Sequence, residues 1–384
     1  MQKIVIFPKK TKNYYMPTKI FFGRGEIMKT PNLIKKKKLK KILLICGSHL
    51  KKTSLLIKFI NKFPDNYEIN IYQDIVSKST FSTINKLTKY CRENKFDCLI
   101  GMGGGTILDT TKAASVLSKN GGIIEDYVLF KNREIIRRGI FFIAIPTTSG
   151  TGSEVTPWST IWGDDKKKYS LSSNLFMFPN IAIVDPELTN TLSSKTTAES
   201  GIDALCQAFE SYWDNKHNII SDKHALIAIK FILGNLELAV RKKTNIARDR
   251  MAWGSMNGGL AFSNTQTNIC HAISYPITGY WNIAHGQATS ITLPIFIREI
   301  LPYLSKNRKS KLLKIMNAKD INEAEKNVLS LMLKIGLKTK LSDLNISKKD
   351  IDIVLNESFC YPQIKNIPIN YNRENLRILI ESIY

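Results

Sequence analysis

The sequence predicts two domains, an α/β domain with a mostly parallel sheet followed by an all-α domain. Two patterns support this: short β-branched runs alternate with helical stretches in the first half, and from about residue 193 apolar residues recur only at helical spacing. The length of 384 residues also exceeds what one compact domain usually needs. We therefore expect domains at 1–192 and 193–384, with Pro186 and the run NTLSS marking the change in composition.

In the first domain, the expected strands lie at 41–46, 68–75, 98–102, 141–145 and 181–184. Helical patterns lie between them at 52–62, 79–93 and 106–118. Strands that alternate with helices of about ten to fifteen residues form βαβ units, so we expect a Rossmann-like sheet. Such a sheet binds its ligands at the carboxyl ends of the strands.

In the second domain, apolar spacing of three and four residues predicts helices at 193–213, 222–238, 246–262 and 287–304. The remainder continues as helices at 324–336, 348–358 and 373–383. No strand pattern interrupts them, so we expect this domain to be entirely helical.

The chain is strongly basic, with 56 Lys and Arg against 32 Asp and Glu and a net charge of +24. A surplus of this size can indicate nucleic acid or an anionic membrane. The lysines are scattered and lack clustered aromatic residues, so we expect a lysine-rich surface and no nucleic-acid partner. No apolar window is long enough for a membrane helix. The six cysteines show no CxxC spacing and are interpreted as free thiols of a cytoplasmic protein.

A glycine-rich loop is the first candidate site. The segment FDCLIGMGGGTILDTTK takes a buried strand into Gly103, Gly104 and Gly105, and Thr106 then opens a helix. Consecutive glycines let backbone N–H groups close on an oxyanion, and the helix N-terminus adds a partial positive charge. The pattern predicts a pyrophosphate cradle, with a strand–helix turn that binds no ligand as the alternative.

A second loop follows the strand FFIAI and reads PTTSGTGSE. Thr147, Thr148 and Ser149 begin a dense set of hydroxyl groups beside two glycines. Because both loops follow strands of one parallel sheet, we expect them to face the same crevice, as a dinucleotide requires.

The helical domain carries a candidate metal site. Asp203 and Gln207 are four residues apart, which places them on one helix face among apolar neighbours. A carboxylate buried there needs a partner, and a cation is suitable. His271 and His285 flank a segment in which Pro276 and Gly279 are expected to bend the chain. One Asp and two His with open positions suit catalytic Zn²⁺ or Fe²⁺.

Together these motifs resemble the iron-containing (group III) alcohol dehydrogenases, relatives of the glycerol dehydrogenases and dehydroquinate synthases. The resemblance runs through nearly the whole chain and rests on GGGTILDTTK, PTTSGTGSE, GIDAL and the two-histidine segment ending in AHG. It implies that family's fold, an NAD(P)-dependent aldehyde reductase, and a homodimer or larger assembly. It implies metal ligands at Asp203, His271 and His285, and nucleotide contacts at Gly103, Gly104, Gly105, Thr106, Asp109, Lys112, Thr147, Thr148 and Ser149.

Two positions depart from the common pattern of the family. Gln207 replaces the usual His after the Asp, and Tyr275 replaces a second His four residues after His271. With these departures included, the segments DALCQAFESYW and HAISYP are similar to the corresponding segments of the phosphonoacetaldehyde reductases. Those enzymes reduce phosphonoacetaldehyde to 2-hydroxyethylphosphonate. That subgroup would have a lysine where this chain has Gln266. The alternatives are a general alcohol dehydrogenase acting on small neutral aldehydes and a metal-free reductase.

Cofactor preference is expected to depend on the end of the first strand. Members that prefer NAD tend to carry Asp at the position of Gly47, where a carboxylate binds the ribose 2′-hydroxyl and repels a 2′-phosphate. Gly47 repels nothing, and Ser48, Lys51 and Lys52 can bond or neutralise a phosphate. We therefore expect NADPH as the cofactor, with NADH tolerated.

The expected reaction is hydride transfer from nicotinamide to an aldehyde carbon, with the carbonyl oxygen polarised by a metal. Tyr275 lies one helical turn after His271 and is the candidate catalytic residue that orients the substrate or relays a proton. The alternative is that Tyr275 is a packed core residue.

Overall fold

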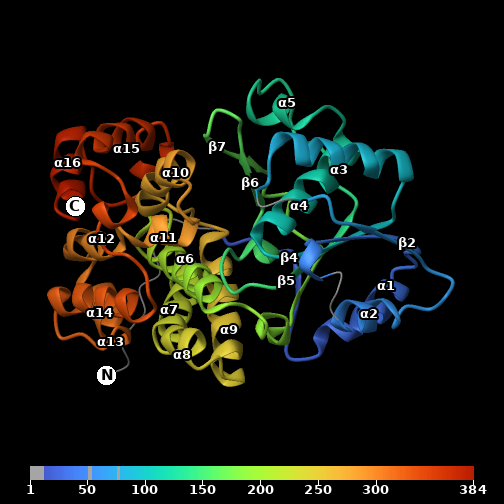
Figure 1. The fold of residues 1–384 in the computed structure, drawn as a ribbon, viewed down its shortest axis with the longest axis horizontal. Coiled ribbons are helices and arrows are strands. Elements are labelled where there is room, and N and C mark those ends of the chain that lie inside the picture. The colour runs from blue at the N-terminus through green and yellow to red at the C-terminus, as the bar shows by residue number, and fades with distance from the viewer. Residues whose placement is uncertain (1–12, 51–53, 76–77) are drawn as a thin grey trace.

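The computed structural model describes residues 13–50, 54–75 and 78–384. An α/β half and a helical half lie side by side, and a small β-hairpin stands between them (Figure 1). The predicted α/β and all-α parts are thus present, and the change from strands to helices falls between Val184 and Ser194. The exact domain boundary at 192/193 remains a prediction.

The first half is built on a six-stranded sheet with the order β1-β8-β5-β4-β2-β3, in which every pair of neighbours is parallel. Chain order reverses between β2 and β4, and such a switch point opens a crevice at the carboxyl ends of the strands. The strands are β1 (Lys19–Phe22), β2 (Lys41–Cys46), β3 (Glu68–Tyr72), β4 (Cys98–Gly103), β5 (Phe141–Pro146) and β8 (Ile181–Val184).

Helices cover both faces of this sheet. Alternate residues of β2 point to opposite faces: Ile42 and Leu44 pack towards α1 and α2, whereas Leu43 and Ile45 pack towards α3 and α4. A sheet buried on both faces needs continuous apolar strands, which explains KILLIC in β2. The helices are α1 (Thr30–Lys35), α2 (Ser54–Ile60), α3 (Phe81–Asn94), α4 (Gly105–Asn120) and α5 (Ile124–Val128).

The second half is a helical domain with its own apolar core. Its longest helix, α6, is capped by Ser193, whose hydroxyl accepts a hydrogen bond from the Thr196 N–H. The helices are α6 (Ser194–Trp213), α7 (Ile219–Leu233), α8 (Leu236–Arg241), α9 (Asn245–Phe262), α10 (Ile269–Trp281), α11 (His285–Ser290), α12 (Leu293–Ile300), α13 (Lys306–Ile315), α14 (Ile321–Lys334), α15 (Ile351–Ser358) and α16 (Arg373–Glu381).

Several local expectations are corrected. The segment around Pro276 is helical, because α10 runs through this residue and ends at Trp281, where Asn282 follows with a left-handed φ of 53°. Proline removes one helical hydrogen bond, but α10 is buried on nearly every side and its packing outweighs that loss. The expected helix 287–304 is instead broken near Pro294, and 222–238 is broken at Gly234.

The pattern analysis also missed β1 and the antiparallel hairpin of β6 (Trp158–Trp162) and β7 (Lys168–Ser172). The hairpin lies against α5 and reaches α10 (Figure 1). In the described part of the chain, no helix is long and apolar enough to span a membrane. The six cysteines are free, as expected.

Candidate active site

A cavity of about 1100 Å³ lies where the two halves and the hairpin meet. Gly105 and Thr106 of α4 line one part of it, and Asp203, His271 and His285 line another. The predicted phosphate loop and the predicted metal ligands therefore face one common space, as hydride transfer between a dinucleotide and a metal-bound substrate requires.

Three loops meet at the carboxyl edge of the sheet. Cys46 of β2 pairs with Met102 of β4, so Gly47 and Ser48 leave the sheet beside Gly103. Gly103 pairs in turn with Pro146 of β5. The Thr147 N–H donates to the Gly103 carbonyl at 3.0 Å, which ties the two predicted loops together.

Gly105 is needed for the close contact between the loops, whereas a side chain at Gly104 would meet the second loop at an ordinary van der Waals distance. A Cβ on Gly105 would lie 2.6 Å from Thr151 Cγ2, and one on Gly104 would lie 3.4 Å from Thr148 Cγ2. Ser149 is buried beside them. The backbone of the first loop thus packs against side chains of the second loop, and the start of α4 lies at the edge of the sheet where the sequence predicts a pyrophosphate.

Asp109 and Lys112, two of the predicted nucleotide contacts, both form hydrogen bonds within the protein. Lys112 is only 1% exposed, and its Nζ donates to the Ser153 carbonyl, the Ser153 and Thr156 hydroxyls and the Trp158 carbonyl. Burial lowers the pKa of Lys112 to about 8. These contacts engage all three donors of the Lys112 ammonium group, so a direct bond from Lys112 to a nucleotide phosphate remains a prediction that requires one of these contacts to break.

Asp109 lines the cavity, but its carboxylate is already engaged. Its Oδ1 accepts from the Ser153 hydroxyl at 2.5 Å, and its Oδ2 accepts from the Thr160 N–H at 2.9 Å. Asp109 and Lys112 together fasten α4 to the second loop and to the hairpin.

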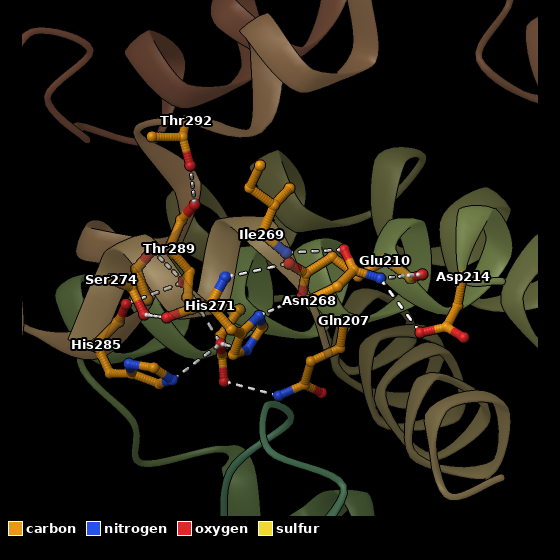
Figure 2. A network of polar contacts seen from close by, with 12 residues as sticks. Gln207, Glu210, Asp214, Asn268, Ile269, His271, Ser274, His285, Thr289 and Thr292 are labelled. Carbon is orange, nitrogen blue, oxygen red and sulfur yellow. Dashed lines mark hydrogen bonds and ion pairs between the residues drawn. The ribbon is translucent and has the colours of Figure 1, made fainter. Parts of the chain in front are cut away.

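The predicted metal ligands converge. One ligand atom each of Asp203, His271 and His285 lies within 4.8 Å of the others. Asp203 Oδ1 is 3.4 Å from His271 Nε2 and 3.8 Å from His285 Nε2. Figure 2 shows the two histidines turning towards the same point from α10 and from the start of α11. A carboxylate and two imidazoles at this spacing fit one divalent metal.

The electrostatics of Asp203 and His285 fit a metal site. Burial raises the pKa of Asp203, but the neighbouring His285 and His271 outweigh it and the net pKa is lowered, so the carboxylate is anionic. Burial and then the charge of Lys168 hold the pKa of His285 well below its usual value, so its imidazole is neutral. A neutral imidazole and an ionised carboxylate are the forms that bind metal. Burial lowers the pKa of His271, but Glu210 and Asp203 outweigh it and raise this pKa to about 9, so the His271 imidazole must release a proton when it binds a metal.

Glu210 is a functional residue that the sequence reasoning missed. It is fully buried, its Oε1 accepts from the His271 N–H at 3.1 Å, and its Oε2 contacts His271 Nδ1 (Figure 2). This contact directs His271 Nε2 towards Asp203, an arrangement common behind metal-binding histidines. Asp203, Gln207 and Glu210 follow the spacing i, i+4, i+7 on α6, a signal that could have identified it.

Gln207 presents its nitrogen to Asp203. Its Nε2 donates to Asp203 Oδ2 at 3.0 Å, and its Oε1 is buried without a hydrogen-bond partner among the described residues. An amide ligates a metal through its oxygen, so Gln207 would have to turn its amide to become a fourth ligand. The unpaired oxygen is consistent with that use.

Tyr275 is brought into the site by its position on α10. Its ring stacks on His285 with centroids 6.1 Å apart and meets Tyr361 edge to face at 4.7 Å. Burial raises its pKa well above the usual value, although hydrogen bonds with Thr267 and Gln363 act in the opposite direction. The phenol is therefore protonated at neutral pH, and its hydroxyl group can donate a hydrogen bond as well as accept one.

The role of Glu210 leads to a prediction about metal affinity. Glu210→Gln should weaken metal binding by about 10- to 100-fold, because the imidazole of His271 loses the charge that orients it and raises its basicity. Metal content after competition with a chelator measures this. Glu93→Gln, which removes an exposed carboxylate on α3, is the matched control. Equal metal affinity in both variants would show that the charge of Glu210 does not contribute to metal binding.

Comparison with known proteins identifies the family. A model of the iron-containing alcohol dehydrogenases matches residues 17–186, and a model of the C-terminal part of that family matches residues 197–384. The chain belongs to the iron-containing alcohol dehydrogenases.

Individual members of this family align along the chain. A sulfoacetaldehyde reductase of Bilophila wadsworthia is 30% identical over 96% of this chain and 98% of its own. Long-chain-alcohol dehydrogenase 1 of Geobacillus thermodenitrificans is 35% identical over 77% of this chain and 74% of its own. The crystal structure of a sulfoacetaldehyde reductase from Bifidobacterium kashiwanohense in complex with NAD⁺ superposes with a TM-score of 0.91 and 29% identity, covering 97% and 99% of the two chains.

The enzyme is therefore an NAD(P)-dependent oxidoreductase of the alcohol dehydrogenase type. Its Asp-His-His cluster lies on helices of the domain that the C-terminal model matches, and the spacing of its ligand atoms fits one metal ion.

Proposed function

We propose that this enzyme reduces a short aldehyde carrying an anionic group, with phosphonoacetaldehyde, converted to 2-hydroxyethylphosphonate, as the first candidate. The charge of the cavity supports this: among its described lining residues are five lysines and two aspartates. Both aspartates are engaged, Asp203 with the histidines and Asp109 with Ser153 and Thr160. A cavity with excess positive charge attracts and retains an anion.

The position of Gln266 is also compatible with an anionic substrate. Lys216 Nζ lies 3.5 Å from Gln266 Oε1, so a cation from the segment after α6 stands beside the position where a lysine was expected. Two relatives are named for sulfoacetaldehyde, a two-carbon aldehyde with a sulfonate group. Phosphonoacetaldehyde has the same carbon chain and also ends in a tetrahedral oxyanion.

Asp203, His271 and His285 would hold one divalent metal, Fe²⁺ or Zn²⁺, with Gln207 as a possible fourth ligand. When bound, such a metal polarises the carbonyl oxygen of the substrate. Asp203 contributes the anionic ligand, and Glu210 fixes the orientation of His271. The protonated Tyr275 would orient the substrate from one side of the site, since its ring lies against His285.

The nucleotide would lie along Gly47, Ser48, the loop of Gly103 to Thr106 and the loop of Thr147 to Ser149, which share the carboxyl edge of the sheet. We favour NADPH because Gly47, the residue after β2, carries no carboxylate, and the adjacent Ser48 is exposed. Lys51 and Lys52, also expected near the 2′-phosphate, lie outside the described residues. One relative, from Clostridium saccharobutylicum, is named as NADPH-dependent.

This preference can be tested by introducing the missing carboxylate. Gly47→Asp should lower kcat/KM with NADPH by about tenfold or more relative to NADH, because a carboxylate repels the 2′-phosphate and a tenfold change needs only about 1.4 kcal/mol. Initial rates with both cofactors measure the ratio, and the melting temperature checks the fold. An equal loss with both cofactors would contradict the preference.

The substrate proposal is tested by following NADPH oxidation with phosphonoacetaldehyde, sulfoacetaldehyde, propionaldehyde and glycolaldehyde, with the metal content measured in parallel. We expect higher kcat/KM for the two anionic aldehydes. Equal or better turnover of the neutral aldehydes would overturn the substrate assignment. Full activity after complete removal of the metal would overturn the metal-dependent reaction.

A general alcohol dehydrogenase acting on small neutral aldehydes is the second candidate. Trp158 and Phe262 stack at 6.2 Å between centroids and line the cavity, so part of its wall is apolar. The relative from Geobacillus thermodenitrificans is named for long-chain alcohols. Faster turnover of propionaldehyde in the same assay would favour this candidate. A homodimer or larger assembly and a cytoplasmic location remain predictions.

A further inference from the structure

Lys168, the first residue of β7, is held over the cavity by contacts on both sides of the hairpin. Its backbone N–H donates to the Tyr361 hydroxyl at 3.1 Å. Two residues earlier, the Lys166 carbonyl lies so close to α10 that a Cβ on Gly279 would be 2.3 Å from it. The absence of a side chain at Gly279 therefore lets the hairpin rest on α10. The contacts at Tyr361 and Gly279 thus fix the backbone position of Lys168 without involving its side chain.

The ammonium group of Lys168 faces the metal-ligand cluster. Its Nζ is 4.0 Å from the centroid of the Tyr275 ring, the same ring that stacks on His285. It is also close enough to the ligands that its charge helps to lower the pKa values of His285 and Asp203. The cation thus lies inside the catalytic part of the cavity.

This cation lacks an acidic partner. Within the described chain, Lys168 forms no ion pair, and its contact for Nζ is the face of Tyr275. The nearest acids are committed elsewhere: Asp203 to the histidines, Asp109 to Ser153 and Thr160, and Glu210 to His271. Burial lowers the pKa of Lys168 to about 8 despite the attraction of these carboxylates. A partly desolvated cation without a counter-ion is stabilised when an anion binds beside it.

The other lysines of the cavity are less suited to this role. Lys78 Nζ donates to Asn282 at 3.1 Å, Lys167 pairs with Glu357 at 3.4 Å, and Lys131 and Lys216 are exposed at the rim. These residues add positive potential but are solvated or already bonded. Lys168 alone among the five combines proximity to the metal ligands with an unused charge.

We propose that Lys168 binds the anionic group of the substrate and thereby selects short ω-anionic aldehydes. This inference rests on the proposed function and identifies the residue that would confer its specificity. In a two-carbon aldehyde, a single methylene group separates the carbonyl group from the phosphonate or sulfonate. If the carbonyl oxygen lies at the proposed metal site of Asp203, His271 and His285, the phosphonate or sulfonate group also lies close to these ligands. Only an ammonium group next to the ligands, such as that of Lys168, can then bind it. In an aldehyde with more carbon atoms, the anionic group would lie beyond the ammonium group of Lys168.

The test compares Lys168→Met, which keeps the aliphatic stem, with Lys168→Arg, which keeps the charge, and with Lys166→Gln as a matched control. Lys166 is an exposed neighbour that does not line the cavity. In Lys168→Met, the ratio of kcat/KM for phosphonoacetaldehyde over propionaldehyde should fall about 10- to 100-fold, mainly through KM, as expected for loss of a charge-assisted hydrogen bond. Lys168→Arg should recover part of the ratio, and Lys166→Gln should keep it.

Inhibition by methylphosphonate, measured against propionaldehyde, provides a readout that does not depend on turnover of the anionic aldehyde. Its inhibition constant should rise about 10- to 100-fold in Lys168→Met. Unchanged inhibition, an unchanged substrate ratio, or weaker NADPH binding as the main defect would overturn the role of Lys168. Failure of the proposed function looks different, because the unmodified enzyme itself would then show no preference for anionic aldehydes.

Discussion

Asp203→Asn is expected to abolish metal binding and to reduce aldehyde reduction by about 1000-fold. Asn has the same shape but no charge, so two neutral ligands, His271 and His285, would remain. Polarisation of the carbonyl by a metal contributes several kcal/mol to catalysis, and each tenfold in rate corresponds to about 1.4 kcal/mol. Metal content and steady-state kcat with a saturating aldehyde measure the two effects.

A melting-temperature series separates loss of metal from loss of fold. Adding Fe²⁺ or Zn²⁺ should stabilise the unmodified enzyme, because a ligand that binds only the folded state raises its stability. The same addition should leave Asp203→Asn unchanged, whereas Asp65→Asn, at an exposed position, should respond like the unmodified enzyme. An Asp203→Asn protein that still binds metal with normal affinity and retains its rate would disprove the ligand assignment.

The parts of the site that could be predicted from the sequence are those that local patterns specify. Buried strands with few polar residues, such as Lys41–Cys46 and Ile181–Val184, were located with their observed bounds. The loops after β4 and β5 were recognisable because glycines and hydroxyl groups at strand ends have few other uses. Asp203, His271 and His285 were recognisable because a buried carboxylate and paired histidines need a common partner.

The remaining features depend on tertiary contacts that no local pattern encodes. The environment of Lys112 is created by Ser153 and Trp158, which are more than forty residues away in sequence, so the pattern could not distinguish a buried tether from a phosphate ligand. Glu210 acquires its role only when α10 packs beside α6. Lys168 was overlooked because the short, polar strands of its hairpin give a weak alternating signal.

Gly286→Ala is the second large expected effect, and it acts on both stability and the metal site. Gly286 follows His285 at the start of α11, and a Cβ there would lie 1.8 Å from the Glu199 carbonyl oxygen of α6. Because the obstructing atom belongs to a helix backbone, α11 must move away from α6. We expect a destabilisation of about 3 kcal/mol, at the upper end for an overpacked site. The free energy of unfolding in urea measures it.

The same displacement should move His285 away from Asp203, so metal affinity should fall together with stability. Gly258→Ala is the matched control, because it adds a methyl group to a buried helix, α9, where the nearest atom outside that helix's own backbone is the Ala204 carbonyl at 3.4 Å. There, the higher helix propensity of Ala should leave the enzyme as stable as before or more so, by about 0.5–1 kcal/mol. If both variants lost stability equally, close approach of α6 and α11 would not be the cause. If Gly286→Ala lost stability but kept normal metal affinity, the position of His285 would not depend on the contact between these two helices.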